Sequence, residues 1–108
     1  MMYYDFNAGN KAYKLRLNTR NTIQLEKTLG CNPLSVFGDG ETLPTFTVMI
    51  AILHASLQQY HHGITMADAA DIFDEYLADG NSATDFIPVI LEIYKASGLI
   101  REVDGEKN

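Results

Sequence analysis

Residues 45–62, TFTVMIAILHASLQQYHH, form the stretch on which the expected fold of this chain depends. At about 3.6 residues per turn, its apolar side chains make one continuous stripe, and further apolar residues cover most of the other faces. The stripe consists of Phe46, Met49, Ile50, Leu53, Leu57 and Tyr60, and the other faces carry Val48, Ala51, Ile52 and Ala55. The uninterrupted apolar run is much shorter than the ~20 residues that cross a bilayer. We therefore expect a central core helix.

Capping residues divide the following sequence into two further helices. Pro44 and Thr45 start the central helix, and Gly63 is expected to end it. Thr65 and Asp68 have the spacing of a capping box and open a third helix. Its expected core residues are Met66, Ala69, Ala70, Phe73, Tyr76 and Leu77.

The fourth helix is expected over residues 83–97. Ser82 and Asp85 form a second capping pair, and Gly98 stops the helix. Pro88 lies near the start, where it either bends the first turn or moves the true start to Phe86. The expected core stripe consists of Phe86, Ile87, Ile90, Ile93 and Tyr94.

Residues 1–30 have a different pattern from the helical half. An Asn/Gly-rich break separates two β-prone runs, which predicts an antiparallel hairpin with strands over residues 2–7 and 11–17. Asn18 or Thr19 then caps a short helix that ends near Leu29, with Gly30 following it. A lone hairpin is marginal in water, so its apolar face must pack on helices or pair with another chain.

The expected architecture is one α+β, mainly α domain, with an N-terminal β-hairpin and about four helices packed around the central apolar helix. Its parts are the hairpin (1–18), a short helix (19–30), a loop (31–43), the helical core (44–98) and a flexible tail (99–108). The loop either tucks its apolar residues under the core or acts as a recognition loop that presents Phe37, with a hinge at residues 38–40.

The charge of the chain is unevenly distributed. Up to Gly30 there are five basic and two acidic residues, whereas three basic and twelve acidic residues follow. A net charge of -6 argues against binding to nucleic acid, whose phosphates attract Lys and Arg. The pattern is either a set of ordinary solvated faces or a device that guides assembly with a partner or a second copy.

Three groups of residues are candidates for partner binding. The third helix carries an acidic row that includes Asp71, Asp74 and Glu75, which is either a solvated face or a docking stripe for a basic partner. Val89 and Leu91 flank the core stripe of the fourth helix and give it more apolar surface than an outer helix of a monomer needs. Phe37 is the third candidate. The central helix would be the rigid wall behind them.

The sequence gives no positive sign of catalysis, metal or cofactor. His54 and His61 would lie two turns, ~10.5 Å, apart on a helix, too far to share one metal ion. We expect the histidines to stabilise the helix end through its dipole. Cys31 has no neighbouring base, and as the only cysteine it forms no internal disulfide. Because the N-terminus also lacks the pattern of a signal peptide, we expect a cytoplasmic protein that does not enter membranes.

The sequence resembles the tail assembly chaperones of long-tailed bacteriophages and prophages. The similarity lies in residues 13–17 (YKLRL), 25–30 (LEKTLG) and 32–34 (NPL), and in the closing run IYKASGLI of residues 93–100. It implies a nonenzymatic protein that oligomerises and coats apolar segments of the tape-measure protein, assists assembly of the tail-tube protein in the bacterial host, and is absent from the mature virion. The alternatives are a ring-forming adaptor or neck protein and, from another class, a small DNA-binding regulator.

Overall fold

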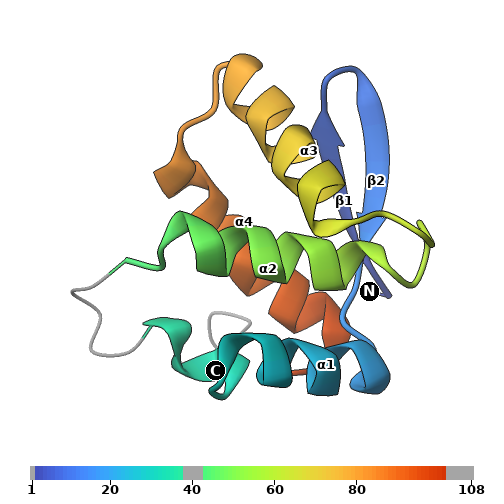
Figure 1. Cartoon of the computed structure of the whole chain (residues 1–108), viewed down its shortest axis with the longest axis vertical. Coiled ribbons are helices and arrows are strands. Elements are labelled where there is room, and N and C mark those ends of the chain that lie inside the picture. Colours follow the sequence, from blue (N-terminus) through green and yellow to red (C-terminus); the bar gives the residue numbers. More distant parts are fainter. Residues whose placement is uncertain (1, 38–42, 102–108) are drawn as a thin grey trace, which may run out of the picture.

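A computed structural model describes residues 2–37 and 43–101. A two-stranded antiparallel hairpin precedes the helices, and α2 crosses the middle of the molecule with α3 on one side of it and α1 on the other (Figure 1). The elements are β1 (Tyr4–Ala8), β2 (Lys11–Leu15), α1 (Thr19–Leu29), α2 (Phe46–Leu57), α3 (Met66–Ala78) and α4 (Phe86–Ser97), with short 3-10 helices η1 (Pro33–Phe37) and η2 (Ala83–Asp85). The predicted α+β fold with a hairpin and four helices is confirmed.

The hairpin turns through Gly9 and Asn10. Both residues have positive φ, 57° and 67°, as a tight two-residue turn requires. Ala8 pairs with Lys11 directly beside this turn, so β1 extends to Ala8, one residue beyond its predicted end. Strand β2 ends at Leu15, two residues before its predicted end, because the Arg16 amide leaves the ladder and donates to the Ser56 carbonyl of α2 at 2.9 Å.

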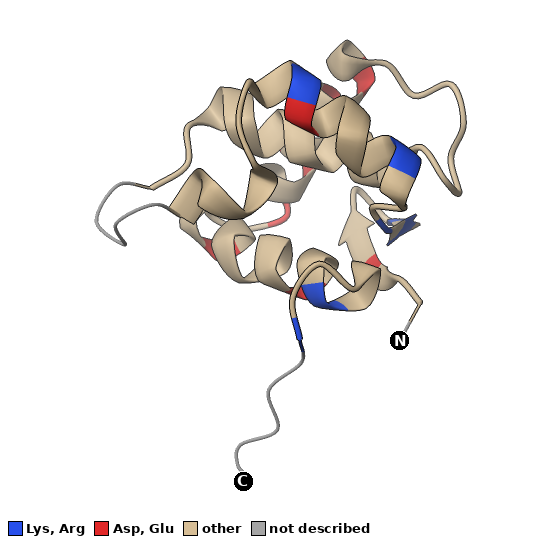
Figure 2. Ribbon diagram, turned by 90° about the horizontal axis from the view of Figure 1, so that it is seen from below, with Lys and Arg blue, Asp and Glu red and all other residues tan. Residues whose placement is uncertain are grey.

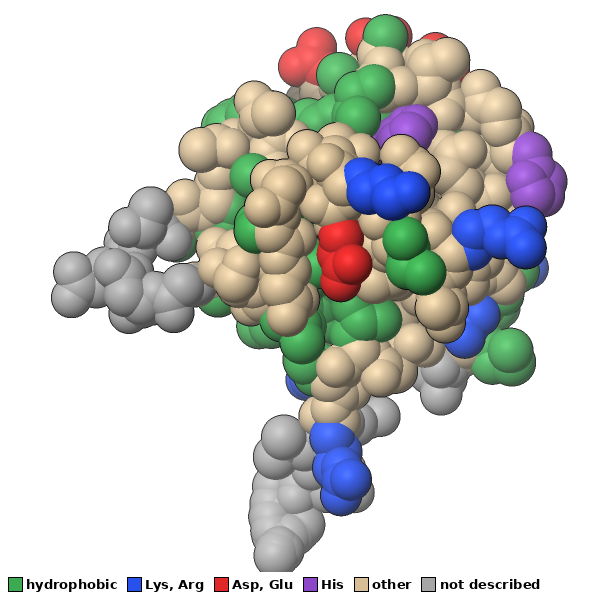
Figure 3. Space-filling view, turned by 60° about the horizontal axis from the view of Figure 1, so that its bottom comes forward, with side chains coloured by type: hydrophobic (Ala, Val, Ile, Leu, Met, Phe, Trp, Pro, Cys, Tyr) green, Lys and Arg blue, Asp and Glu red, His purple; other side chains and the backbone are tan. Residues whose placement is uncertain are grey.

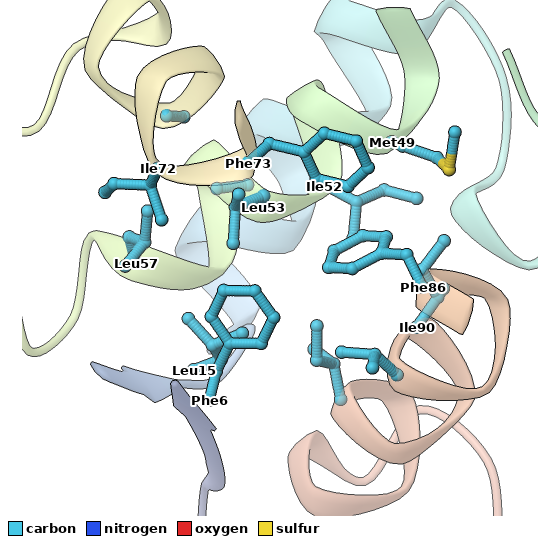
Figure 4. Close-up of a cluster of buried hydrophobic side chains, with 14 of the residues drawn as sticks. Phe6, Leu15, Met49, Ile52, Leu53, Leu57, Ile72, Phe73, Phe86 and Ile90 are labelled. Atoms are coloured by element: carbon cyan, nitrogen blue, oxygen red, sulfur yellow. The ribbon is translucent and has the colours of Figure 1, made fainter. Parts of the chain in front are cut away.

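The inner face of the hairpin packs on the helices. Phe6 and Leu15 project from the strands into a cluster formed by side chains of α2, α3 and α4 (Figure 4). The Phe6 ring contacts Phe86 edge-on at 5.9 Å and lies 5.0 Å from Tyr76. The apolar face that a two-stranded sheet cannot cover by itself is thus buried by helices.

Helix α2 begins as predicted but ends earlier. The Thr45 side chain accepts a hydrogen bond from the Val48 amide and caps the start. The helix stops at Leu57, whereas the sequence predicted an end near Gly63. In a longer helix the Ser56 carbonyl would accept from the amide four residues later, but it accepts from Arg16 instead. The hydrogen bond from the Arg16 amide therefore replaces the helical bond that would extend α2 by another turn.

Both predicted capping boxes are present. Thr65 and Asp68 bond reciprocally at the start of α3, and Ser82 and Asp85 do so at the start of η2. Helix α4 itself begins at Phe86, so Pro88 lies in its first turn, where the missing amide leaves no helical bond unmade.

The core face of α3 differs from its predicted one. It consists of Ala69, Ile72, Phe73 and Tyr76. The predicted core residues Met66 and Ala70 are exposed, because they lie toward the side of α3 that borders a groove with α1 and α2.

The outer edge of β2 is covered by the turn that follows α2. The Lys14 amide donates to His61 Nε2 at 3.0 Å, and the Lys14 ammonium lies 5.0 Å from the Tyr3 ring centre and 5.7 Å from that of Tyr60. Only an unprotonated Nε2 accepts such a bond. The prediction that His61 acts as a cation on the helix dipole is therefore wrong, because its ring is an acceptor for the hairpin.

We expect Gly9→Ala to destabilise the protein by about 2–4 kcal/mol, against about 1–2 kcal/mol for Gly30→Ala. Both glycines have positive φ, but an added Cβ at Gly30 meets nothing, whereas at Gly9 it would lie 2.5 Å from Glu75 Oε1 and 3.2 Å from Glu75 Cβ. Urea unfolding of the two variants measures the difference. Equal losses would show that the hairpin turn is not pressed against α3.

We expect the stability of the protein to fall on acidification in a way that depends on His61. Burial, followed by the nearby Lys14 charge, lowers the pKa of His61 below 6.5 in the folded state. The unfolded chain then binds more protons, so the contribution is complete above about pH 6.5 and is lost as the pH falls through the lowered folded pKa. Melting temperatures between about pH 7.5 and pH 5 measure this loss.

Two histidine variants provide the control for this pH dependence. His61→Gln retains a hydrogen-bond acceptor without a titrating ring, so its melting temperature should vary less with pH than that of the wild type. His62→Gln changes the exposed neighbour and should retain the wild-type profile. Equally steep profiles for both variants would contradict the assignment of the acceptor to His61.

Candidate partner-binding surface

An apolar pocket lies where α2 begins, next to η2 and the first turn of α4. Leu43 and Phe46 are 57% and 56% exposed, and the Phe46 ring is held edge-on against Phe73 at 5.7 Å. The pocket has a volume of about 240 Å³ and is lined by Leu43, Pro44, Phe46, Met49, Ala83, Thr84 and Ile87. We call it the Phe46 pocket. Its lining contains no charged residue, and most of the side chains that form it are hydrophobic.

Val89 and Leu91 of α4 were predicted to bind a partner, and of the two only Leu91 extends this apolar surface. Leu91 follows Ile87 by one helical turn on the same face and is 37% exposed. Val89 is buried, with 8% of its surface exposed, so it belongs to the core cluster. The prediction of Val89 as a contact residue is wrong, because its side of α4 faces the interior of the molecule.

The Phe37 side chain packs against α4. Its ring meets the buried Tyr94 ring edge-on at 6.3 Å, and the Tyr94 hydroxyl donates to the Pro33 carbonyl at 2.8 Å. Burial raises the pKa of Tyr94, with a smaller contribution from Cys31. Phe37 and Val36 are thus half-buried, as in the tucked alternative, whereas Leu34 is 41% exposed. The predicted hinge at residues 38–40 lies outside the described residues.

A second apolar depression lies between α1, α2 and α3. It has a volume of about 370 Å³ and is lined by Thr28, Thr47, Ile50, Ala51, Met66, Ala67 and Ala70. We call it the Ile50 groove. Ile50 is half-buried, Met66 is 40% exposed, and none of the lining residues is charged. A smaller hollow of about 90 Å³ continues it along α1 and shares Thr28, Ala51 and Met66 with it.

The predicted acidic row of α3 is exposed. Asp71, Asp74 and Glu75 are all exposed. Glu75 lies beside Gly9, and Asp79 accepts a hydrogen bond from the Gly9 amide at 2.8 Å, so this part of the row faces the hairpin turn. Asp74 lies one turn after Ala70 on the groove side of the helix. Asp71 is a neighbour of both Asp74 and Glu75 on this exposed side of α3, and docking of a basic partner there stays a prediction.

The exposed apolar residues of α2 are the part of this surface that sequence reasoning missed. Phe46 and Ile50 are one turn apart and were both predicted to lie in the core stripe. The cap at Thr45 could have indicated that Phe46 is exposed. It places Phe46 in the first turn of α2, where the helix extends past its neighbours. An apolar stripe by itself does not tell which of its members the other helices cover.

Neither a metal-binding cluster nor a membrane-spanning helix is found among the described residues. Within residues 2–37 and 43–101, no three His, Cys, Asp or Glu side chains lie close enough together to hold a metal ion. The same part of the chain contains no helix with the length and apolar character of a membrane span. Cys31 is exposed. The apolar pocket and groove are thus the most distinctive features of the surface.

One protein-family model matches residues 5–107, and its description is a family of unknown function, DUF6096. No curated protein and no solved structure matches the chain.

We expect alanine substitutions on α4 to distinguish buried from exposed residues by their effect on the free energy of unfolding. Val89→Ala should lower the free energy of unfolding by about 1–3 kcal/mol, because it leaves a cavity among buried residues. Leu91→Ala should change it by less than about 1 kcal/mol, since that side chain is exposed. Urea titrations of the two variants give the comparison. A larger loss for Leu91→Ala would contradict the assignment of faces.

Proposed function

Because the chain belongs to the DUF6096 family, whose description states no function, we propose its function from the Phe46 pocket together with the sequence resemblance. We propose a nonenzymatic tail assembly chaperone of long-tailed bacteriophages or prophages. Its client is the tape-measure protein, whose apolar helical segments it covers before the tail-tube protein assembles around them. It acts in the cytoplasm of the bacterial host and leaves before the virion is complete.

The observation that carries this proposal is the uncovered apolar lining of the Phe46 pocket. Leu43 and Phe46 each expose more than half of their surface beside Ile87, and Leu91 continues the apolar row on α4. An amphipathic helix binds such a surface by placing apolar side chains from successive turns into it. Full burial of one large apolar side chain contributes about 1.5–3 kcal/mol, so two or three of them support reversible binding.

The rigidity of the pocket supports the same role. Phe46 rests on Phe73, and Phe73 contacts Phe86 at 5.1 Å, so the pocket wall belongs to the aromatic part of the core. A preformed wall loses little conformational freedom when a client binds. A chaperone that must release its client during tube assembly gains from a small, preformed surface, because a small contact area limits affinity.

The alternative is a ring-forming adaptor or neck protein. The observation that favours it is the uneven charge of the helices, since α1 carries Arg20 and Lys27 against Glu26, whereas the charged residues of α3 are all acidic (Figure 2). An adaptor remains in the finished particle, whereas a chaperone does not, so the protein content of purified virions distinguishes the two functions.

We expect this chain to keep a tape-measure protein soluble and to copurify with it when both are expressed together. Phe46→Asp should reduce the copurified amount about tenfold or more, because it introduces a charge that a bound apolar helix would desolvate. Met2→Asp is the matched control, since Met2 is 64% exposed and is not among the residues that line the pocket. It should leave copurification unchanged.

The proposal fails if the wild-type chain neither changes the solubility of the tape-measure protein nor copurifies with it. If both aspartate variants lose the client equally, the Phe46 pocket is not the binding surface. Thermal melting of both variants shows whether each is folded.

A further inference from the structure

We propose that α1 of one copy docks into the Ile50 groove of a second copy, with Ile23 in the groove and the basic residues of α1 beside the acidic flank of α3. This interaction surface lies apart from the Phe46 pocket, so it does not depend on the proposed function. It is argued from the exposed faces of the two helices and from their opposite charges.

The outward face of α1 carries an apolar side chain between two basic ones. Arg20, Ile23 and Lys27 lie on one side of the helix, opposite the buried Leu25. Ile23 is 49% exposed, so its side chain is available for a contact. Glu26 is the remaining charge of α1 and, three residues after Ile23, lies beside it at the edge of this face.

The Ile50 groove offers the matching surface. Ile50, Met66, Ala67 and Ala70 give it an apolar lining without charge, and the small alanines let another helix approach closely. Asp71 and Asp74 follow on the exposed side of α3, and that helix contains no basic residue. Docked α1 would therefore bury Ile23 against apolar side chains while Arg20 and Lys27 meet carboxylates of the partner.

The outward face of α1 and the Ile50 groove are separate surfaces, since the groove lies between α1, α2 and α3 and the outward face of α1 is on the other side of that helix. Along its longest axis, α1 is at one end and α3 at the other, with α2 between them (Figure 1). The view with the α1 end turned forward shows Lys and Arg beside hydrophobic side chains on the near face, together with one acidic side chain, and further Asp and Glu at the far rim (Figure 3). Each copy then has one α1 face and one groove, and head-to-tail docking of one into the other gives a ring or an open chain.

The test is self-association of the full chain measured by light scattering over a range of protein concentrations. A single helix face buries less than the ~1,000 Å² of a stable interface, so we expect an average mass that rises with concentration. Ile23→Asp and the double variant Asp71→Lys/Asp74→Lys should each be monomeric at every concentration. Phe46→Asp and Lys11→Asp, which change exposed residues outside the contact, should associate like the wild type.

Mixing the defective variants tests the head-to-tail arrangement. Ile23→Asp retains an intact groove, and Asp71→Lys/Asp74→Lys retains an intact α1, so the mixture should form a one-to-one dimer that does not grow further. A chain with Arg20→Glu/Lys27→Glu and Asp71→Lys/Asp74→Lys together should regain association, since the reversed charges again match.

Three results would overturn the proposal. The first is a wild-type chain that stays monomeric at all concentrations, which would leave the groove to a basic helix of another protein. The second is association that neither Ile23→Asp nor Asp71→Lys/Asp74→Lys weakens, since the contact would then lie elsewhere. The third is a mixture of the two variants that remains monomeric although circular dichroism shows both to be folded.

Discussion

In the part of the chain that the structure describes, β1 and β2 form a sheet of two strands, and the rest of the fold depends on how this hairpin is held in place. Strand β2 has an outer edge whose amides would otherwise face solvent or another chain. The Lys14 and Arg16 amides donate to His61 Nε2 and to the Ser56 carbonyl, so this edge is covered by the end of α2. At the other end of the hairpin, the Gly9 amide bonds Asp79 of α3. The hairpin is thus attached at both ends to helices that come later in the sequence.

This attachment also determines which parts of α2 remain open. The second half of the helix lies against the hairpin and α4, where Ile52, Leu53 and Leu57 are completely buried. Its first half extends beyond those neighbours, so Phe46 is exposed and Ile50 is covered only in part. The Phe46 pocket and the Ile50 groove therefore lie on two sides of the same half-covered helix. One apolar helix supplies both the centre of the core and the surface that we propose for partners.

Features set by neighbouring residues were predictable from the sequence, and those set by distant contacts were not. The hairpin, the boxes at Thr65 and Ser82 and the stop at Gly98 follow from local hydrogen bonding and backbone conformation. The predicted end of α2 was wrong because the observed end depends on the hydrogen bond between Ser56 and Arg16, which are forty residues apart in sequence. Val89 and Leu91 are both apolar and two residues apart, and only the packing of α4 tells the buried residue from the exposed one.

The hydrogen bond between the Leu17 amide and Ser97 Oγ, 2.8 Å long, joins residues that are 80 positions apart. On a ribosome that adds about 5–20 residues per second, the interval between their syntheses is about 4–16 s. During that interval the hairpin and α2 have been made, but the α4 side chains that cover Phe6 and Leu15 have not. The native core can close only after the α4 side chains have been made, so folding is completed late in synthesis.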